Sequence, residues 1–335
     1  MLTEQEKQKL HGFSFIDLFC GIGGFHLALS SLGAKCVFAS DINEKACSVY
    51  ERNFKIKPQG DITKIKCKEI PSHDILCAGF PCQPFSISGN KKGFDDKNGK
   101  LFFEIVRIAR FHKPRVIFLE NVSNLEAHND GKTLETIKQK LKSIGYRAFS
   151  QVLNASDYGV PQARKRIYII AFRNDLGVKA FCFPQTEQKI VCVKDILEPS
   201  VDAKYAIKRN DILINDNEKH AISRKLVRIG SVGPGRQGER IYSVQGQATT
   251  LSSQGGGPGG KTGIYKVGET TRILTPRECA RAMGFPDSFI LMGSDFDAYT
   301  QFGNSVVVNV VQKIALAAAN TLHKEDMNEH GIKQD

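Results

Sequence analysis

The chain lacks the patterns that mark a metal centre or a disulfide-stapled secreted protein. Its nine cysteines include no Cys-x-x-Cys pair and no cysteine–histidine cluster at metal-ligand spacing, so we expect no metal. An odd cysteine count and a polar first ten residues, unlike a signal peptide, predict a reducing, cytoplasmic location. No apolar run approaches the roughly 20 residues that span a bilayer, so we expect no membrane contact.

A surplus of positive charge is the main feature of the composition. The formal net charge is +12 and the pI is about 9.2. Such a surplus is typical of proteins that neutralise phosphates, although solubility or attraction to a membrane surface would also explain it. The basic residues come in sets: Lys64, Lys66 and Lys68; Lys138, Lys140 and Lys142; Arg164, Lys165 and Arg166; Arg224, Lys225 and Arg228.

Residues 13–172 alternate short apolar runs with helix-like segments. The first apolar run, residues 15–19, leads into the glycine turn Cys20-Gly21-Ile22-Gly23-Gly24 and a helix-like segment that ends at Gly33. Further strands are expected at 36–40, 74–77 and 116–119, and further helices at 43–53, 101–111 and 133–143. This alternation predicts an α/β fold, a mostly parallel sheet with helices on both faces.

Glycine becomes very frequent between Gly230 and Gly263. A flexible low-complexity linker is one interpretation. The strand-like pieces at 241–244 and 248–252 instead favour a small, irregular, mostly β second domain. Polar side chains on a glycine-rich backbone suit contact with DNA base edges and phosphates.

Cys82 has surroundings that packing does not explain. It lies between Pro81 and Pro84, after the apolar strand that ends at Gly79. Prolines exclude a helix and stiffen the loop. A thiol on a stiff loop at the end of a core strand is placed where open α/β sheets carry their chemistry.

Three acidic residues are candidates for binding or catalysis, and two of them, Asp41 and Glu120, follow predicted strands. Asp41 is placed to accept hydrogen bonds from ribose hydroxyls, and Asp61 either binds an adenine amino group or caps a helix. Glu120 ends the run 116–119, where a buried carboxyl group must be paired or must take a proton at a raised pKa. A salt bridge to Arg164 or Arg166 is the structural alternative. Those two arginines, at i and i+2 on an extended segment, share a face and could clamp a phosphate or a base carbonyl.

Six segments together resemble the ordered motif set of the DNA cytosine-C5 methyltransferases. They are residues 15–24, Pro81-Cys82-Gln83, Glu120-Asn121-Val122, Gln162-x-Arg164-x-Arg166, residues 277–286 and Gly303-Asn304-Ser305. The resemblance covers residues 14–310. It implies a Rossmann-like S-adenosylmethionine-dependent methyltransferase sheet and a smaller target-recognition domain.

The resemblance also implies the roles of individual residues. Cys82 would attack C6 of cytosine, assisted by Glu120, Arg164 and Arg166. The S-adenosyl-L-methionine site would comprise Phe19, Gly21, Gly23, Gly24, Asp41, Ile42, Asp61, Ile62, Pro81, Leu101, Asn304 and Ser305. DNA contacts would come from Ser86, Ser88, Gln237, Arg240, Thr250 and Gln254. Asp41 and Ile42 depart from the glutamate and aromatic residue that are usual there, so a weaker cofactor affinity is expected.

The expected function is sequence-specific methylation of a flipped-out cytosine in double-stranded DNA, in a type II restriction-modification system. The enzyme would be a monomer, and a cognate restriction endonuclease would act on the same site without needing to bind it. A GCGC-like target is a hypothesis. The alternatives are a catalytically silent DNA-binding protein and an RNA cytosine-C5 methyltransferase.

The expected domains follow from the same reading. Residues 1–192 would form the catalytic and cofactor-binding domain, completed by a C-terminal helix at 304–322. Residues 193–275 would form the target-recognition domain, residues 276–303 a hinge, and residues 323–335 a disordered tail.

Overall fold

The computed structural model describes residues 2–80, 101–215 and 221–329, and they form two compact units. The first unit comprises Met1–Leu153, Lys165–Gln185 and Val310–Asp335, and the second comprises Asn154–Arg164 and Thr186–Asn309. Residues 154–164, which the sequence placed with the catalytic domain, therefore group with the second unit. They do so because Gln162 forms a parallel bridge with Ala248.

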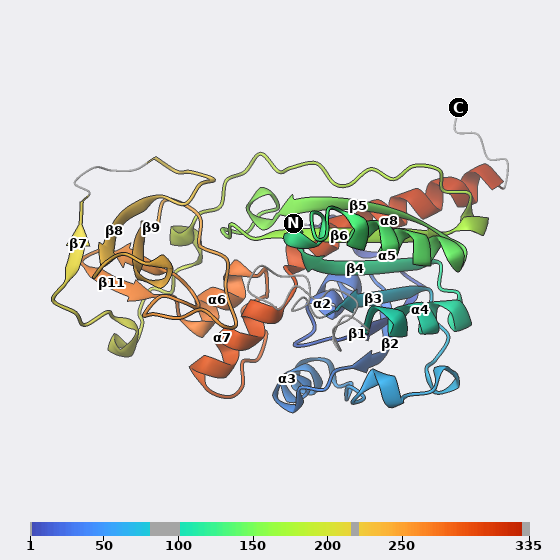
Figure 1. Ribbon diagram of the computed structural model, residues 1–335, viewed down its shortest axis with the longest axis horizontal. Helices are drawn as coiled ribbons and strands as arrows, with labels where there is room; N and C mark the ends of the chain where they lie inside the picture. The colour runs from blue at the N-terminus through green and yellow to red at the C-terminus, as the bar shows by residue number, and fades with distance from the viewer. Residues whose placement is uncertain (1, 81–100, 216–220, 330–335) are drawn as a thin grey trace. The chain divides into compact units, whose positions relative to one another are not determined.

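A six-stranded sheet forms the centre of the first unit (Figure 1). Its order is β2-β1-β3-β4-β6-β5, with β1–β4 parallel and β6 antiparallel to β4. The strands are β1 (Ser14–Leu18), β2 (Lys35–Ser40), β3 (Ile75–Gly79), β4 (Val116–Val122), β5 (Tyr146–Asn154) and β6 (Lys165–Arg173). The predicted α/β class is confirmed.

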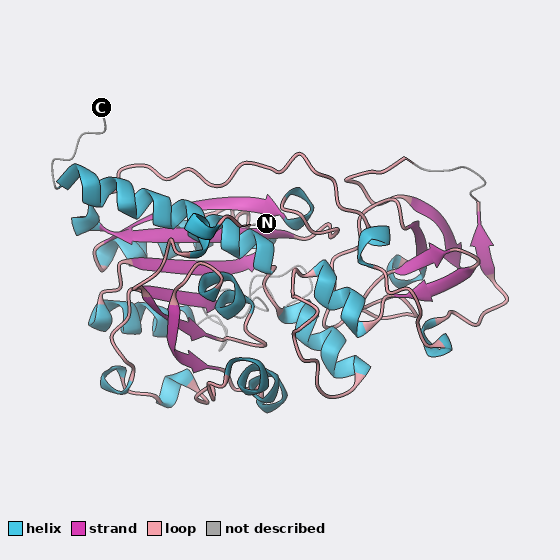
Figure 2. Cartoon of the chain, turned by 180° about the vertical axis from the view of Figure 1, so that it is seen from behind, coloured by secondary structure: helices cyan, strands magenta, loops and turns pink. Residues whose placement is uncertain are grey.

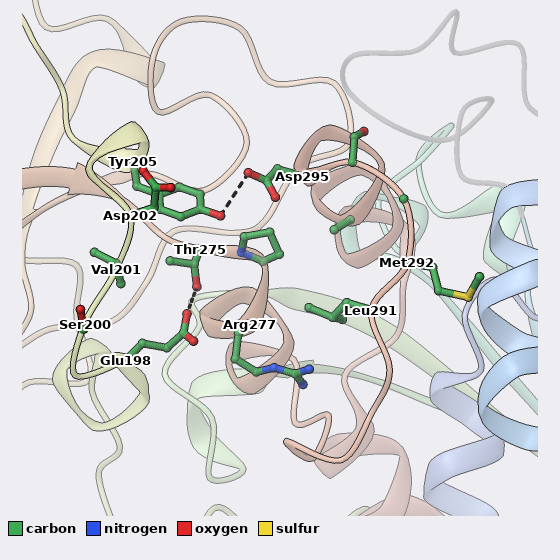
Figure 3. A pocket seen from close by; sticks show the side chains of 14 residues that line it. Glu198, Ser200, Val201, Asp202, Tyr205, Thr275, Arg277, Leu291, Met292 and Asp295 are labelled. Carbon is green, nitrogen blue, oxygen red and sulfur yellow. Dashed lines mark hydrogen bonds between the residues drawn. The ribbon is translucent and has the colours of Figure 1, made fainter.

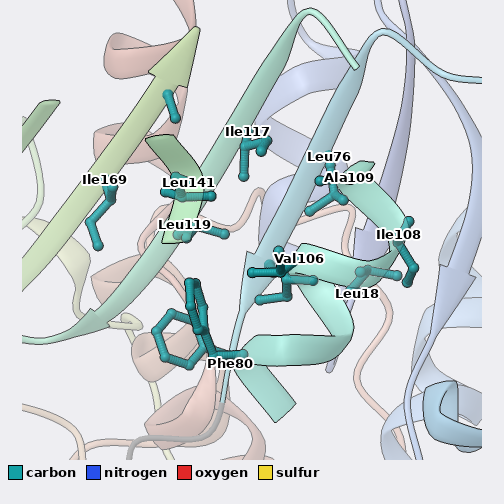
Figure 4. Close-up of a cluster of buried hydrophobic side chains, with 14 of the residues drawn as sticks. Leu18, Leu76, Phe80, Val106, Ile108, Ala109, Ile117, Leu119, Leu141 and Ile169 are labelled. Atoms are coloured by element: carbon teal, nitrogen blue, oxygen red, sulfur yellow. The ribbon is translucent and has the colours of Figure 1, made fainter. Parts of the chain in front are cut away.

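Helices α4 (Leu101–His112) and α5 (Lys132–Ser143) cover one face of this sheet (Figure 4). Their apolar residues meet the residues of alternate strand positions that point to that face. The labelled part of this core is Leu18, Leu76, Phe80, Val106, Ile108, Ala109, Ile117, Leu119, Leu141 and Ile169. The strands are apolar over most of their length because both faces are buried.

The opposite face carries α2 (Gly24–Ser30) and α8 (Val308–Glu329). The ring of Phe25 packs edge-on against Phe118 of β4, with 5.0 Å between centroids. Gln312 of α8 donates a hydrogen bond to Ser31 Oγ, just after α2. Helix α3 (Glu44–Phe54) begins at Asn43, whose side chain accepts the backbone N–H of Ala46. A short α1 (Glu4–Lys7) precedes β1.

The C-terminal helix differs from its predicted bounds. Helix α7 (Asp295–Asn304) ends in the Gly-Asn-Ser motif, where Ser305 is extended, and α8 begins only at Val308. Within residues 295–324, an 18-residue window has a mean hydropathy of 1.4 and is long and apolar enough to span a membrane by length and composition alone. Of the relevant window, 61% is buried inside the protein, as in a core helix.

The second unit contains a five-stranded sheet of order β11-β10-β9-β8-β7 (Figure 2). Pairs are antiparallel except β9 with β10. The strands are β7 (Ile212–Ile214), β8 (Arg228–Val232), β9 (Arg240–Ser243), β10 (Ile264–Val267) and β11 (Thr270–Ile273). Helices α6 (Pro276–Ala282) and α7 occupy the expected hinge region, each begun by a capping box.

The glycine-rich segment is packed rather than linker-like. A Cβ at Gly238 would overlap the backbone of Gly256, and one at Gly255 or Gly260 would overlap the backbone of the facing glycine loop. Gly259 N–H also donates to Gly238 O at 2.8 Å. Only glycine allows backbone to approach backbone this closely.

Candidate active site

Glu120, one of the candidate catalytic residues, lies near the carboxyl end of β4 and next to the end of β3. Gly79, the last residue of β3, is in parallel register with Glu120 of β4. Cys82 follows Gly79 by three residues in the sequence. Cys82 itself lies outside the described residues, as do Pro81, Ser86 and Ser88.

Glu120 is buried and paired with Arg166. Its Oε1 lies 3.2 Å from Nε of Arg166, and the two side chains are only 11% and 16% exposed. The antiparallel register of β4 and β6 sets Arg166 opposite Val122, two residues from Glu120. Of the two partners that the sequence left open, Arg166 is the one in contact, and the buried carboxyl group is stabilised by it.

Asn121 is a functional candidate that the sequence reading did not single out. Its buried side chain donates from Nδ2 to the carbonyl of Phe80 at 3.2 Å, and its Oδ1 accepts the N–H of Val122. Phe80 is the last described residue before the Cys82 loop. Asn121 thus ties Phe80, just before that loop, to β4. The position of Asn121 next to Glu120 in the sequence could have indicated this role.

The glycine turn after β1 adopts left-handed backbone conformations. Phe19, Gly21 and Gly23 have φ values of +56°, +53° and +87°, a conformation that is costly for phenylalanine. The space beside Gly21 is open, whereas a Cβ at Gly23 would overlap the ring of Phe54. Gly24 begins α2. The turn therefore offers bare backbone on one side and rests on an aromatic ring on the other.

A buried polar pair supports that ring. His26 stacks on Phe54 with 3.9 Å between ring centroids, and its Nδ1 lies 2.7 Å from the hydroxyl of Tyr50. Burial lowers the pKa of His26 to about 4. The imidazole is neutral near pH 7 and acts as part of the support.

Asp41 ties the glycine turn to β2. One carboxylate oxygen accepts the N–H of Gly21 and the other that of Asn43, both at 2.8 Å. The adjacent Ile42 is 76% exposed, an unusual state for a large apolar side chain at a strand end. An exposed apolar side chain beside an open glycine turn is a suitable surface for a planar ring.

Asp61 caps a short helix, which is one of the two roles that the sequence predicted for it. Its Oδ1 accepts the N–H of Thr63 at the start of a 3-10 helix, Ile62–Lys64. Ile62 is buried, and Leu101 is half-buried at the first position of α4. The cap uses Oδ1 of Asp61. Binding of an adenine amino group by Asp61 stays a prediction.

Asp17 of β1 carries a second signal that the sequence reading missed. The side chain is fully buried, and neither carboxyl oxygen has a hydrogen-bond partner among the described residues. Burial raises the pKa of Asp17 well above its usual value, and the charge of Asp41 raises it further. A fully buried carboxyl group two residues before the strained Phe19 is costly and calls for a structural or functional reason.

Most of the other cysteines are unsuited to nucleophilic attack. Burial raises the pKa of Cys36 to about 12 and that of Cys47 to about 11. Burial likewise raises the pKa of Cys20, Cys77 and Cys279 well above the usual value. Thiols that stay protonated at neutral pH are inert. Cys67, half-buried, accepts a hydrogen bond from Arg107 and lies outside the candidate site.

The motif Gln162-x-Arg164 belongs to the second unit and binds backbone there. Arg164 is buried and donates to the carbonyls of Leu251, Gly303 and Ser305 at 2.8–3.1 Å. Arg164 thus donates to backbone carbonyls of the second unit, and Arg166 pairs with Glu120 in the first. In the same unit, Asn304 is exposed and Ser305 is buried.

The predicted DNA-contacting residues of the second unit are all exposed. Gln237 begins the 3-10 helix Gln237–Glu239, and Arg240 begins β9. Thr250 and Gln254 lie on the segment that follows Ala248. Exposed polar side chains on a tightly packed glycine-rich backbone fit a surface that reads a duplex.

A pocket of the second unit lies apart from the candidate site residues. It measures about 370 Å³ and lies wholly within the second unit, between residues 198–205, α6 and the start of α7 (Figure 3). Its polar groups bond one another: Tyr205 donates to Asp295 at 3.1 Å, and Thr275 donates to Glu198 at 2.5 Å. None of the residues singled out above as functional candidates lines this cavity.

Comparison with known proteins identifies the family. The model of the C-5 cytosine-specific DNA methylases matches residues 13–320. The chain belongs to that family. It is 51% identical over 323 residues to the type II methyltransferase M.HhaI of Haemophilus parahaemolyticus, covering 96% of this chain and 99% of that protein. It is 42% identical over 322 residues to the type II methyltransferase M.HpaII of Haemophilus parainfluenzae, covering 90% and 87%.

Solved structures of similar fold show the same architecture. A crystal structure of the Schizosaccharomyces pombe Dnmt2 methyltransferase superposes with a TM-score of 0.70 at 22% identity, covering 93% of this chain and 99% of that one. A putative DNA modification methyltransferase from an Escherichia coli prophage gives 0.69 at 20% identity, with the same coverage. The protein is a DNA (cytosine-5-)-methyltransferase with the expected fold.

Proposed function

We propose that this methyltransferase modifies a flipped-out cytosine in a specific double-stranded DNA sequence through a covalent bond between Cys82 and C6. The observation that carries the proposal is the register of Gly79 with Glu120, together with the Glu120–Arg166 contact of 3.2 Å. This register brings the strand that leads to Cys82 beside the one acidic group that the mechanism needs. The nine-cysteine chain offers few other nucleophiles, because burial keeps most of its thiols protonated.

The chemistry follows from the residues. Attack of the Cys82 thiolate on C6 makes C5 nucleophilic, which splits one difficult step into easier ones. Glu120 would hold a proton at N3 and accept a hydrogen bond from the exocyclic amine, drawing electron density from the ring. Arg166 orients Glu120 and supplies positive charge. Once C5 carries the methyl group, its proton would pass to water, and the Cys82 thiolate would leave C6, which restores the aromatic ring.

We assign the cofactor site to the carboxyl ends of β1 and β2 and the start of α4. The open face of Gly21 and the exposed apolar side chain of Ile42 fit a ligand with a planar ring. S-adenosyl-L-methionine supplies the methyl group when bound there. The proposed contacts are Phe19, Gly21, Gly23, Gly24, Asp41, Ile42, Asp61, Ile62, Pro81 and Leu101, completed by Asn304 and Ser305.

DNA recognition is assigned to exposed side chains of the second unit and to two loop serines. Gln237 and Ser88 would fill the gap that the flipped cytosine leaves, and Arg240 would read guanine by a bidentate contact. Thr250, Gln254 and Ser86 complete the set. The net charge of +12 supports binding to phosphates.

The biological setting is inferred from the relatives, which are named type II methyltransferases. We propose that the enzyme is a cytoplasmic monomer that protects DNA from a restriction endonuclease of the same specificity. The endonuclease would act on the same sequence without needing to bind the methyltransferase.

Bisulfite sequencing of a plasmid from cells that express the chain tests the proposal. We expect full conversion except at one cytosine within a fixed sequence, with a GCGC-like sequence as the specific hypothesis. The Cys82→Ala variant should give no protected cytosine while retaining DNA binding. A plasmid without protected cytosines in the wild-type strain would contradict DNA methylation, and protection by Cys82→Ala would contradict the covalent mechanism.

A further inference from the structure

The peptide groups of Leu251 are held on both sides by one sequence motif. Oε1 of Gln162 accepts the N–H of Leu251 at 3.1 Å, and Nη1 of Arg164 donates to the carbonyl of Leu251 at 3.1 Å. Both residues are buried: Gln162 is 0% exposed and Arg164 is 2% exposed. Leu251 lies between Thr250 and Gln254, two of the proposed DNA contacts. Gln162 and Arg164 therefore hold the backbone of residues 248–254, which we call the recognition segment because it contains the proposed DNA contacts Thr250 and Gln254.

Each of these two side chains also reaches a second anchor. Nε2 of Gln162 donates to the carbonyl of Ala282 in α6 at 3.0 Å. Nη2 of Arg164 donates to the carbonyls of Gly303 and Ser305, at 2.9 and 2.8 Å. The recognition segment is thus tied to α6 through one side chain and to the Gly-Asn-Ser turn through the other.

Main-chain contacts continue this attachment along the segment. Ala248 and residues 161–163 exchange two hydrogen bonds, Ala248 N–H to Pro161 O at 2.7 Å and Ala163 N–H to Ala248 O at 2.9 Å. The Thr250 hydroxyl donates to Ala163 O at 2.5 Å. A Cβ at Gly303 would overlap the backbone of Ser252 and Ser253. These contacts fix the position of the segment along residues 161–163 and against Gly303.

We propose that Gln162 and Arg164 are positioning residues for sequence specificity, which act by fixing the register of residues 248–254 against α6 and the Gly-Asn-Ser turn. This inference rests on the proposed function, in which Thr250 and Gln254 contact DNA. A recognition side chain discriminates bases only when its backbone is held, since a bidentate contact requires fixed geometry. Arg164 directs three hydrogen bonds to carbonyls of its own unit, so its contribution passes through this backbone.

The experiment compares methylation rates on short duplexes that carry the target found by bisulfite sequencing and every single-base change of it. We expect Gln162→Met and Arg164→Met to reduce the ratio of kcat/KM between target and changed site about tenfold at one or more positions. The loss should arise from faster methylation of changed sites and a higher KM, with a smaller effect on kcat. Arg164→Lys, which keeps one donor group, should recover part of the ratio.

Arg272→Lys is the matched control. Arg272 is another buried arginine of the second unit, 3% exposed in its side chain and paired with Glu278 at 2.7 Å. The Arg272→Lys variant should have a lower melting temperature and an unchanged ratio of kcat/KM between target and changed site. Ratios within twofold of wild type in both Gln162→Met and Arg164→Met would overturn the inference. If Arg164→Met does not fold, Gln162→Met and Arg164→Lys decide it; a wild-type chain that methylates no fixed sequence would contradict the proposed function instead.

Discussion

The ring of Phe54, the last residue of α3, occupies the place where a side chain at Gly23 would begin. The contact joins a helix to the turn that we assign to the cofactor. His26 stacks on this ring with 3.9 Å between centroids, and Tyr50 packs edge-on against it, so the ring is held by aromatic neighbours. The shape of the turn is therefore set by an aromatic side chain thirty-one positions further along the chain.

Gly23→Ala should abolish cofactor binding and lower the melting temperature. The added methyl group would overlap Phe54, and φ of +87° is strained for alanine. Gly145→Ala is the matched control, because Gly145 has φ of +91° but no atom near its Cβ position. Calorimetric titration with S-adenosyl-homocysteine and thermal melting provide the measurements. In a Phe54→Leu background, Gly23→Ala should cost less than it does alone; equal costs would contradict the proposed contact.

Glu120→Gln should reduce kcat about 10²- to 10⁴-fold while cofactor affinity is unchanged. Glutamine keeps the shape but cannot hold a transferable proton at N3. Arg166→Lys should have a smaller effect on kcat, because a lysine keeps the charge but loses the geometry of the guanidinium contact. Single-turnover rates on saturating DNA measure both. An unchanged kcat in Glu120→Gln would remove Glu120 from the mechanism.

The free energy of unfolding should fall as the pH is lowered from about 6.5 to about 4. Burial lowers the pKa of His26 and of His73 to about 4 in the folded protein, whereas the unfolded chain takes up these protons near 6.5. Between these values the unfolded state binds more protons, so stability declines by up to about 3 kcal/mol for each histidine. Urea denaturation across this range measures the slope. His26→Gln with His73→Gln should flatten it, and an unaltered slope would contradict the assignment.

The Asp17→Asn substitution should raise the free energy of unfolding relative to wild type, and this gain should be larger at pH 8 than at pH 5. Burial raises the folded pKa of Asp17 well above 3.8, so the wild-type protein loses stability as the pH rises through that folded pKa. Asparagine does not titrate, so the variant should gain stability relative to wild type as the pH rises from the unfolded-state pKa toward that raised folded-state pKa.

Asp74 provides the contrast for this experiment. Its Oδ2 accepts the N–H and the hydroxyl of Ser14, at 2.8 and 2.9 Å, so Asp74→Asn should bring no gain. Denaturant midpoints at the two pH values distinguish the variants. A difference between Asp17→Asn and wild type that is the same at both pH values would show that Asp17 does not titrate in this range.

Local sequence was sufficient for the sheet, the glycine turn and the pairing of Glu120. Apolar runs of strand length separated by amphipathic helices leave little choice of fold. The acidic residue at the end of β4 required a partner, and the arginines of the Gln-x-Arg-x-Arg motif were the available cations. Register then selected Arg166, which sequence alone could not do.

The role of Arg164 could not be predicted, because its partners lie 87 to 141 residues further along the chain. They are backbone carbonyls, which carry no signature in the sequence. For the glycine-rich segment, composition alone left a linker open as an alternative to the second domain that we expected. Composition is the same for a flexible linker and for loops packed backbone against backbone, and only the contact of Gly238 with Gly256 distinguishes them.

The recognition segment is held almost entirely through its main chain. Leu251 is bound by its N–H and carbonyl, Ala248 by the same two groups, and Gly255 and Gly260 by close backbone approach. Side chains at positions such as Gln254 can then be exchanged without disturbing what supports them. Such a protein can acquire a new target sequence by substitutions at the surface of one loop, with its chemistry and its fold left intact.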